Sequence, residues 1–389
     1  MRDLRLSATA NADYLACQRR YQLSYIYDLT KEADKDSTRI GGNWHGCHEM
    51  LELPGNTVCP ECKRHEEIRS GCWLCYGTGH TPTDPMETVA RYLHKAYAIV
   101  PDNKTREDWE VERVTLLYSL AGHRWLYEEE EGRWEILGSE IKFEVPVINT
   151  RSKKHRRLAK AVFVGKIDRL VRDRTTGLVY VWERKSTGMP ITNESYWQGL
   201  TQGDQVSGYI YGGRIAQLDG QLEAFGLKPT DPLIAGAWCD VWHKPDIAPK
   251  RVSKADLKAL AETGLYCGTQ VEAPTETPDG NMIETPEMFG ARLLTDIAER
   301  PQHYFAQREV SRTDADLKQF QVRLYGIAKQ IRTVERIGCW LCNLQACEAK
   351  WRCEFLDLCR SGVAVNKDTV PAGYKKKHPV EVEEEIILE

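Results

Sequence analysis

The sequence lacks any long apolar run. No stretch approaches the ~20 apolar residues of a membrane helix, and no N-terminal segment joins a basic start to a long apolar stretch. We therefore expect a cytoplasmic protein that makes no membrane contact.

The sequence also lacks a G-x-x-x-x-G-K-[ST] loop and an excess of positive charge. Any helicase activity would have to come from a separate partner. The chain has 53 Lys and Arg against 57 Asp and Glu, a net charge of −4, which argues against a protein that coats nucleic acid through its overall charge. Local basic patches can still hold phosphate beside a metal enzyme's carboxylates. Two such patches are candidates for DNA contact, although a solvated loop explains the second equally well: Arg19 and Arg20, and RSKKHRR at 151–157 with Lys153, Lys154, Arg156 and Arg157.

Two apolar runs at 161–171 and 178–182 predict a β-hairpin with DRTTG as its turn. Asp168 lies in the first run, and Glu183 and Lys185 end the second, so the two carboxylates meet across the hairpin. Carboxylate oxygens of this kind hold Mg²⁺ or Mn²⁺, and an ammonium two residues further on lies on the same strand face. An ordinary exposed ion pair on a strand would give the same E-x-K tripeptide. This motif alone is therefore weak evidence for a metal site.

Two segments predicted to be helical flank the hairpin in sequence. GGNWHGCHEMLE at 41–52 places His45 at the start of an amphipathic stretch, where its imidazole is a candidate metal ligand. WQGLTQGDQVSGYIYGGR at 197–214 places Gln205 and Tyr209 one helical turn apart, where the pair is able to contact a DNA end or the scissile phosphate.

The order of these motifs resembles that of the RecB-like PD-(D/E)XK nucleases. G-x-x-x-H, G-x-x-D, E-x-K and Q-x-x-x-Y occur here as Gly41 and His45, Gly165 and Asp168, Glu183 and Lys185, and Gln205 and Tyr209. The resemblance implies that His45, Asp168, Glu183 and the main chain of Arg184 bind the catalytic metal. It implies catalytic or substrate-positioning roles for Lys185, Gln205 and Tyr209. An acidic residue on the preceding strand, Glu140 or Glu144, would complete the pattern.

The chain has 13 cysteines, most of them grouped, and in a reducing compartment such groups indicate metal rather than disulfides. Two C-x-x-C pairs, separated by nine residues, have the spacing of a structural zinc site. A redox C-x-x-C is the alternative. The four predicted ligands are Cys59, Cys62, Cys72 and Cys75. Cys239 and Cys267 are isolated and expected to be buried thiols.

A second cysteine group lies in residues 338–362. In the AddB and CRISPR-associated branch of the RecB-like nucleases, one N-terminal and three C-terminal cysteines hold a [4Fe–4S] cluster. The resemblance implies the same here, with Cys17 of CQRRY as the N-terminal ligand. The spacing departs from the family pattern, so the choice of ligands stays open, and zinc is an alternative. The favoured set is Cys17, Cys347, Cys353 and Cys359, with Cys342 or Cys339 as replacements.

Length and an apolar fraction of 41% fit one elaborated domain. We predict an α/β, restriction-endonuclease-like core in which helices flank a mixed β-sheet, with a zinc-binding insertion and an iron–sulfur staple. Helices are expected at 86–100 and 107–131, at 253–264 with a serine cap, and through most of 286–337. The predicted segments are 1–55 (N-terminal nuclease part), 56–82 (zinc insertion), 83–366 (nuclease core, helical region and C-terminal cysteines) and 367–389 (flexible charged tail).

The resemblance implies a metal-dependent deoxyribonuclease, an exonuclease more than an endonuclease, acting on a DNA single strand or duplex end. Recombination, repair and phage DNA processing are the expected settings, with a separate helicase or recombinase as partner. The alternative is a non-catalytic nucleic-acid or protein interaction subunit that retains the fold and its metal clusters.

Overall fold

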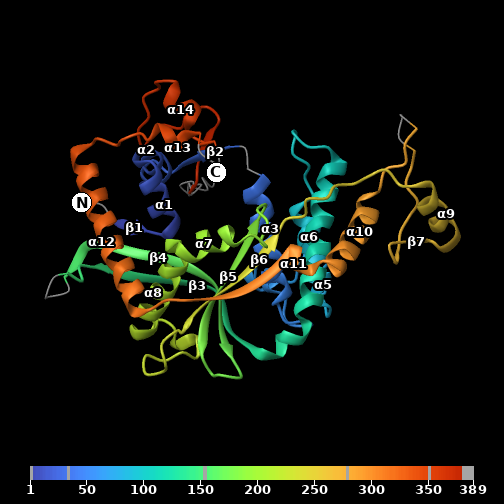
Figure 1. The fold of residues 1–389 in the computed structure, drawn as a ribbon, viewed down its shortest axis with the longest axis horizontal. Coiled ribbons are helices and arrows are strands. Elements are labelled where there is room, and N and C mark those ends of the chain that lie inside the picture. The colour runs from blue at the N-terminus through green and yellow to red at the C-terminus, as the bar shows by residue number, and fades with distance from the viewer. Residues whose placement is uncertain (1–2, 33–35, 152–155, 277–279, 349–351, 379–389) are drawn as a thin grey trace, which may run out of the picture.

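The computed structural model describes residues 3–32, 36–151, 156–276, 280–348 and 352–378. A six-stranded mixed sheet forms its centre (Figure 1). The strands follow the order β1-β4-β5-β6-β9, and β3 pairs separately with β4. Their bounds are β1 Leu4–Leu6, β3 Trp134–Ile148, β4 Arg157–Asp173, β5 Val179–Thr187, β6 Gly236–His243 and β9 Phe305–Ser311.

Strand direction follows from the connections between strands. The short turn after Asp173 joins β4 to β5 antiparallel, as the sequence predicts. β5 and β6 are parallel, because two helices and a loop lie between them in the chain. These helices are α7 (Glu194–Gln202) and α8 (Asp204–Leu218).

Helices cover both faces of the sheet and bury a separate apolar core on each. The larger core lies under α1 (Ala8–Ala16), α8 and α12 (Asp314–Ile337), and includes Val181 and Val241 of the central strands. The second core includes Trp242 and Phe305 of the sheet and is formed mainly by helices. Its helices are α3 (Asp36–Leu51), α5 (Pro85–Ala96), α6 (Arg106–Tyr127), α10 (Pro286–Glu299) and α11 (Pro301–Tyr304).

The two ends of the chain lie together. Figure 1 shows the first helices, in blue, against the last helices, in red. β2 (Leu29–Lys31) pairs antiparallel with β10 (Tyr374–Lys376), and the Arg19 amide donates to the Leu341 carbonyl (3.1 Å). α2 (Gln18–Tyr21) and the π-helix Gln22–Ile26 meet α13 (Leu344–Cys347) and α14 (Leu356–Arg360) here. The flexible tail predicted from 367 is therefore corrected, because 374–376 form a strand; residues 379–389 lie outside the described residues.

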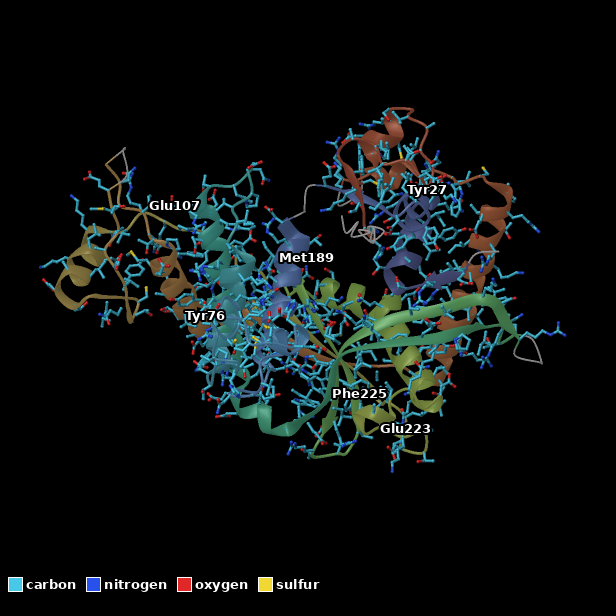
Figure 2. All side chains as sticks on the ribbon, turned by 180° about the vertical axis from the view of Figure 1, so that it is seen from behind. Tyr27, Tyr76, Glu107, Met189, Glu223 and Phe225 are labelled. Atoms are coloured by element: carbon cyan, nitrogen blue, oxygen red, sulfur yellow. The ribbon has the colours of Figure 1, made fainter. Side chains whose placement is uncertain are left out.

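Smaller elements complete the fold. α9 (Lys254–Thr263) starts at the predicted Ser253 cap and precedes a two-stranded ribbon, β7 (Leu265–Tyr266) and β8 (Thr269–Gln270). α4 (Pro60–Arg64) belongs to the first cysteine group. Two 3-10 helices lie in the connections that lead into β3 and β6, at Glu128–Arg133 and Glu223–Phe225. In Figure 2, Tyr76 beside the first cysteine group and Tyr27 near the second lie well apart, so the two groups are separate features.

Four predictions about the elements need correction. α3 begins at Asp36, well before His45. The 197–214 segment forms two helices that meet at Gly203. The 286–337 region, expected to be mostly helical, also contains the strand β9. Buried and exposed residues do not alternate along this strand, so its sequence lacks the pattern by which strands are predicted. Cys239 is buried as expected, whereas Cys267 is exposed on the short ribbon. No helix among the described residues combines the length and apolarity needed to cross a bilayer.

The packing of α8 on β3 gives a testable prediction. A Cβ at Gly212 would overlap the ring of Phe143, which is only 3% exposed. We expect Gly212→Ala to lower the free energy of unfolding by about 1–3 kcal/mol, because the helix must move from the sheet. Urea denaturation followed by circular dichroism measures this change.

Gly199→Ala on α7 is the matched control, since nothing lies within 4 Å of its added Cβ. This exposed helical position should gain about 0.5–1 kcal/mol from the lower backbone entropy of alanine. Equal effects of the two substitutions would contradict the close approach of α8 to the sheet.

Candidate functional site

The β4–β5 hairpin brings the predicted carboxylates together. Arg169 pairs with Trp182 in its antiparallel register, and the same register continued by one residue places Asp168 opposite Glu183. Residues opposite one another share a face of the sheet, and Lys185 shares it because it lies two residues beyond Glu183.

Glu183 is the most deeply buried carboxylate of this group, at 2% exposure. Its Oε1 accepts from Lys185 Nζ (2.6 Å) and from Gln205 Nε2 (2.9 Å). Its Oε2 is buried and has no hydrogen-bond partner among the described residues. Burial raises the pKa of Glu183 to about 7; Lys185 opposes this rise and the nearby Asp168 adds to it. A cation at Oε2 would therefore relieve an electrostatic cost.

Asp168 and His45 approach from different elements. Asp168 Oδ2 accepts the backbone N–H of Arg184 (2.9 Å) and lies 3.6 Å from Nδ1 of His45. Burial lowers the pKa of His45, and the Asp168 charge offsets this only in part. The imidazole is therefore neutral near pH 7, which is the form that binds metal ions.

Gln205 and Tyr209 lie one turn apart on α8, as predicted. Gln205 Nε2 donates to both Glu183 Oε1 and the Tyr209 hydroxyl (3.1 Å). Burial raises the pKa of Tyr209, and the neighbouring Glu183 adds to the rise, so the hydroxyl stays protonated. The glutamine thus orients the buried carboxylate from the helix side.

These side chains offer the types of donor atom that bind a divalent cation. Asp168 and Glu183 supply hard oxygen donors, His45 supplies a neutral nitrogen, and Oε2 of Glu183 has no partner among the described residues. The structure thus brings together the side chains of His45, Asp168, Glu183, Lys185, Gln205 and Tyr209.

The two acidic candidates on β3 are paired elsewhere. Glu140 lies between the register pairs Ser139–Arg169 and Ile141–Ile167, hence opposite Asp168, but its carboxylate forms an ion pair with Lys166. Glu144 pairs with Arg5 (2.7 Å) and both side chains are at least half exposed. Of the two, only Glu140 lies beside Asp168.

The first cysteine group forms a compact site. The four sulfurs of Cys59, Cys62, Cys72 and Cys75 lie within 4.8 Å of one another and all four residues are buried. The Cys59–Cys72 and Cys62–Cys75 sulfurs are 3.8 and 3.5 Å apart. Four thiolates at about 2.3 Å from a tetrahedral ion are about 3.8 Å apart, so the spacing suits a metal held by four sulfurs.

The second cysteine group surrounds a cavity of 460 Å³ where the two ends of the chain meet. Five of the six cysteines considered for this site line it, together with Arg20 and Arg360: Cys17, Cys342, Cys347, Cys353 and Cys359. Cys339 is exposed and does not line the cavity. The geometry therefore favours Cys342 over Cys339 as the replacement ligand.

The basic patches differ in their surroundings. Arg20 forms an ion pair with Asp13 (2.7 Å), and Arg19 donates to Gln22 (2.5 Å), so both guanidinium groups have protein partners. Arg156 and Arg157 are exposed at the start of β4. Lys153 and Lys154 lie outside the described residues.

Sequence analysis missed a polar cluster on the opposite face of the hairpin. Glu52, directly after α3, receives hydrogen bonds from Arg169 and Arg184, and Asp240 of β6 pairs with His123. The alternation of strand side chains was the available signal, because Arg169 follows Asp168 and Arg184 follows Glu183.

The similarity of the chain to known proteins lies at the level of a family model. None of the curated proteins compared with the chain matches it. The model of the PD-(D/E)XK nuclease superfamily matches residues 5–354, a range that includes the sheet and every side chain around Glu183. The chain therefore belongs to the PD-(D/E)XK nuclease superfamily.

Proposed function

We propose that this protein is a metal-dependent nuclease that hydrolyses DNA phosphodiester bonds. One observation carries the proposal: in a chain of this superfamily, Glu183 is buried beside Asp168 and Lys185, and its Oε2 has no hydrogen-bond partner among the described residues. The catalytic residues are Asp168, Glu183, Lys185, Gln205 and Tyr209.

His45, Asp168, Glu183 and the main-chain carbonyl of Arg184 would hold Mg²⁺ or Mn²⁺. When bound, such an ion supplies a Lewis acid for a phosphoryl oxygen and lowers the pKa of a water molecule. The Arg184 amide, bonded to Asp168 Oδ2, fixes that carboxylate before any ligand arrives.

Lys185 supplies the positive charge that belongs to the chain itself. Its Nζ is held 2.6 Å from Glu183 on the same strand face, where it orients an attacking water or neutralises a phosphate oxygen. Gln205 restrains Glu183 from the helix side, and the protonated Tyr209 hydroxyl is placed to donate to substrate or to a bridging water.

Within the superfamily, we propose that the protein belongs to the RecB-like branch that carries an iron–sulfur cluster, as a stand-alone, phage-like member. The order of the motifs and the cysteine-lined cavity between the chain ends support this. A cluster there would join the ends of the nuclease domain and favour exonuclease action on a DNA end, in recombination, repair or phage DNA processing, with any helicase as a separate protein. The segments 1–55, 56–82 and 83–366 remain the proposed units.

A non-catalytic interaction subunit is the second candidate. It would keep the sheet and both cysteine groups without needing an unpartnered buried carboxylate. The intact set of Asp168, Glu183 and Lys185 favours the enzyme.

Substitution at the metal site tests the activity. We expect Glu183→Gln and Lys185→Met each to lower Mn²⁺- or Mg²⁺-dependent cleavage of end-labelled DNA by about 10²–10³-fold or more, because each removes a charge at the reacting phosphate. The position of the label in the products reports the polarity of digestion.

Glu262→Gln and Lys258→Met are matched controls, since these residues form an exposed i,i+4 pair on α9. Their cleavage should equal that of wild type. Unchanged cleavage in the Glu183 and Lys185 variants, or none in wild type that still binds DNA, would support the interaction subunit.

Metal analysis tests the first cysteine group. We propose one structural Zn²⁺ bound by Cys59, Cys62, Cys72 and Cys75. Cys62→Ser should lose that zinc and lower Tm, because the four sulfurs form the core of their own small cluster. Elemental analysis and thermal unfolding measure both, with Cys267→Ser, exposed and remote from the group, as control. Zinc retained by Cys62→Ser would contradict the site.

Anaerobic purification tests the second group. We expect iron and acid-labile sulfide in wild type, lost in Cys17→Ser, Cys347→Ser, Cys353→Ser and Cys359→Ser, because soft thiolates hold such clusters. Cys339→Ser is the matched control and should keep the iron. If iron is lost in Cys342→Ser and kept in Cys347→Ser, Cys342 is the ligand in place of Cys347. Zinc found in place of iron would contradict an iron–sulfur cluster at this site.

A further inference from the structure

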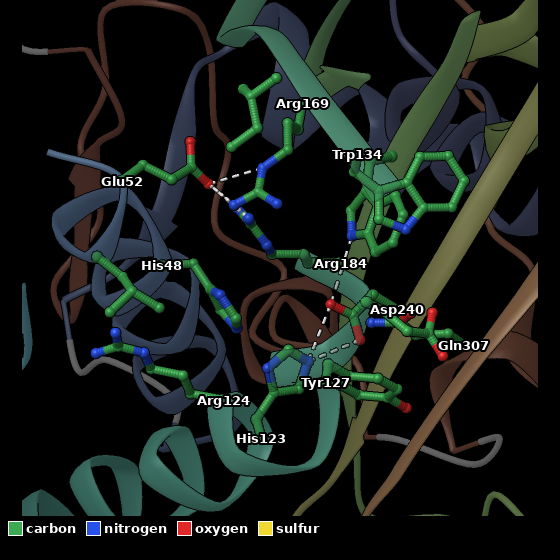
Figure 3. Close-up of a pocket in the computed structure, with 14 residues that line it drawn as sticks. His48, Glu52, His123, Arg124, Tyr127, Trp134, Arg169, Arg184, Asp240 and Gln307 are labelled. Atoms are coloured by element: carbon green, nitrogen blue, oxygen red, sulfur yellow. Dashed lines mark hydrogen bonds and ion pairs between the residues drawn. The ribbon is translucent and has the colours of Figure 1, made fainter. Parts of the chain in front are cut away.

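A polar cavity of 370 Å³ lies on the face of the hairpin opposite Glu183 and Lys185. α3, α6 and the strands β3 to β6 and β9 surround it (Figure 3). Its volume falls within the range of small-molecule sites, about 300–1,000 Å³. Its lining comprises His48, Leu51, Glu52, His123, Arg124, Tyr127, Glu130, Trp134, Ile136, Arg169, Trp182, Arg184, Asp240 and Gln307.

Two carboxylates organise the inner wall. Glu52 Oε1 accepts from Arg169 Nε (2.8 Å) and from Arg184 Nη2 (2.6 Å). Asp240 lies 3.1 Å from His123 Nε2 and accepts from the Trp182 indole (3.4 Å), as the dashed lines of Figure 3 show. These bonds fix the charged groups but do not use all of their donors.

Several buried polar atoms of the lining have no hydrogen-bond partner among the described residues. They are Nε of Arg184, Nε2 of His48 and Nε1 of Trp134. Arg184 and His48 are only 2% and 3% exposed. A buried donor left unpaired costs about 1–3 kcal/mol, so a ligand that accepts hydrogen bonds here would remove a substantial penalty.

One arginine of the cavity is available to an anion. The lining has three arginines, Arg124, Arg169 and Arg184, against Glu52 and Asp240 at the inner wall and the exposed Glu130 at the open side, and Glu52 is bonded to Arg169 and Arg184. Arg124 forms no ion pair within the part of the chain that the structure describes, and the residue lines the cavity on the side of α6.

The remaining walls are aromatic and apolar. Trp134, Trp182 and Tyr127 line the cavity, and Figure 3 shows the Trp134 indole beside Asp240 and Gln307. Exposed Glu130 and Ile136, the latter 46% exposed, mark the side open to solvent. A flat unsaturated body suits such walls, and an acceptor group suits the arginines.

We propose that this cavity is a second ligand site that binds a small anion with a planar aromatic body, of the nucleoside monophosphate class. The phosphate would take the free donors of Arg124 and Arg184, and the base would lie along the Trp134 wall. The argument uses only the cavity, so it goes beyond the proposed hydrolysis and does not depend on it.

Isothermal titration calorimetry of the full chain with deoxyadenosine monophosphate tests the site, without added Mg²⁺ or Mn²⁺. We expect a Kd of about 1 mM or tighter for wild type. Arg124→Gln and Trp134→Phe should each weaken binding by about tenfold, because the first removes a donor to the phosphate and the second reduces the aromatic wall along which the base lies. Arg106→Gln and Trp125→Phe are matched controls, exposed on the same helix as Arg124, and should bind as wild type does.

Two further ligands separate the contributions. Deoxyadenosine and inorganic phosphate should each bind at least about tenfold more weakly than the monophosphate. If deoxyadenosine binds as tightly as the monophosphate, the site does not require an anion. If inorganic phosphate binds as tightly as the monophosphate, the site does not require an aromatic body. Glu183→Gln should retain binding whether or not DNA is cleaved. Undetectable binding in wild type, or equal binding in Arg124→Gln and Trp134→Phe, would overturn the site.

Discussion

The antiparallel register of β4 and β5 is the constraint on which both faces of the sheet depend. With Arg169 opposite Trp182, Asp168 and Glu183 share one face and the two arginines share the other. A slip of one residue would send every side chain of one strand to the wrong side. The candidate metal site and the cavity on the other face therefore both arise from one pairing pattern.

That register is held by buried charge as well as by apolar packing. Glu52 joins a guanidinium from each strand of the hairpin, since it accepts from Arg169 of β4 and Arg184 of β5. Apolar replacements for a buried ion network are often neutral or stabilising, so stability alone does not account for it. A network that bonds to both strands instead favours one alignment of β4 with β5. Asp168 and Glu183 on the other face lie opposite each other only in that alignment.

Sequence patterns predicted local structure better than they predicted contacts between distant segments. The hairpin, the cap at Ser253 and the one-turn spacing of Gln205 and Tyr209 depend on local periodicity, and the structure has all three. β9 was missed because its outer residues are exposed, which removes the apolar alternation. Glu52 was missed because its partners are more than a hundred residues away in sequence, and no local pattern records such a contact.

Arg184 connects the two faces directly. Its amide donates to Asp168 on the candidate catalytic side, while its side chain reaches Glu52 on the other. The residue is 2% exposed, so its backbone and side chain move within a packed interior that tolerates little displacement. A change in the contacts of its guanidinium must therefore be accommodated by the strand that also positions Glu183 and Lys185. One residue thus joins the candidate catalytic face of the hairpin to the cavity on the other face, because its backbone positions Asp168 and its side chain lines the cavity.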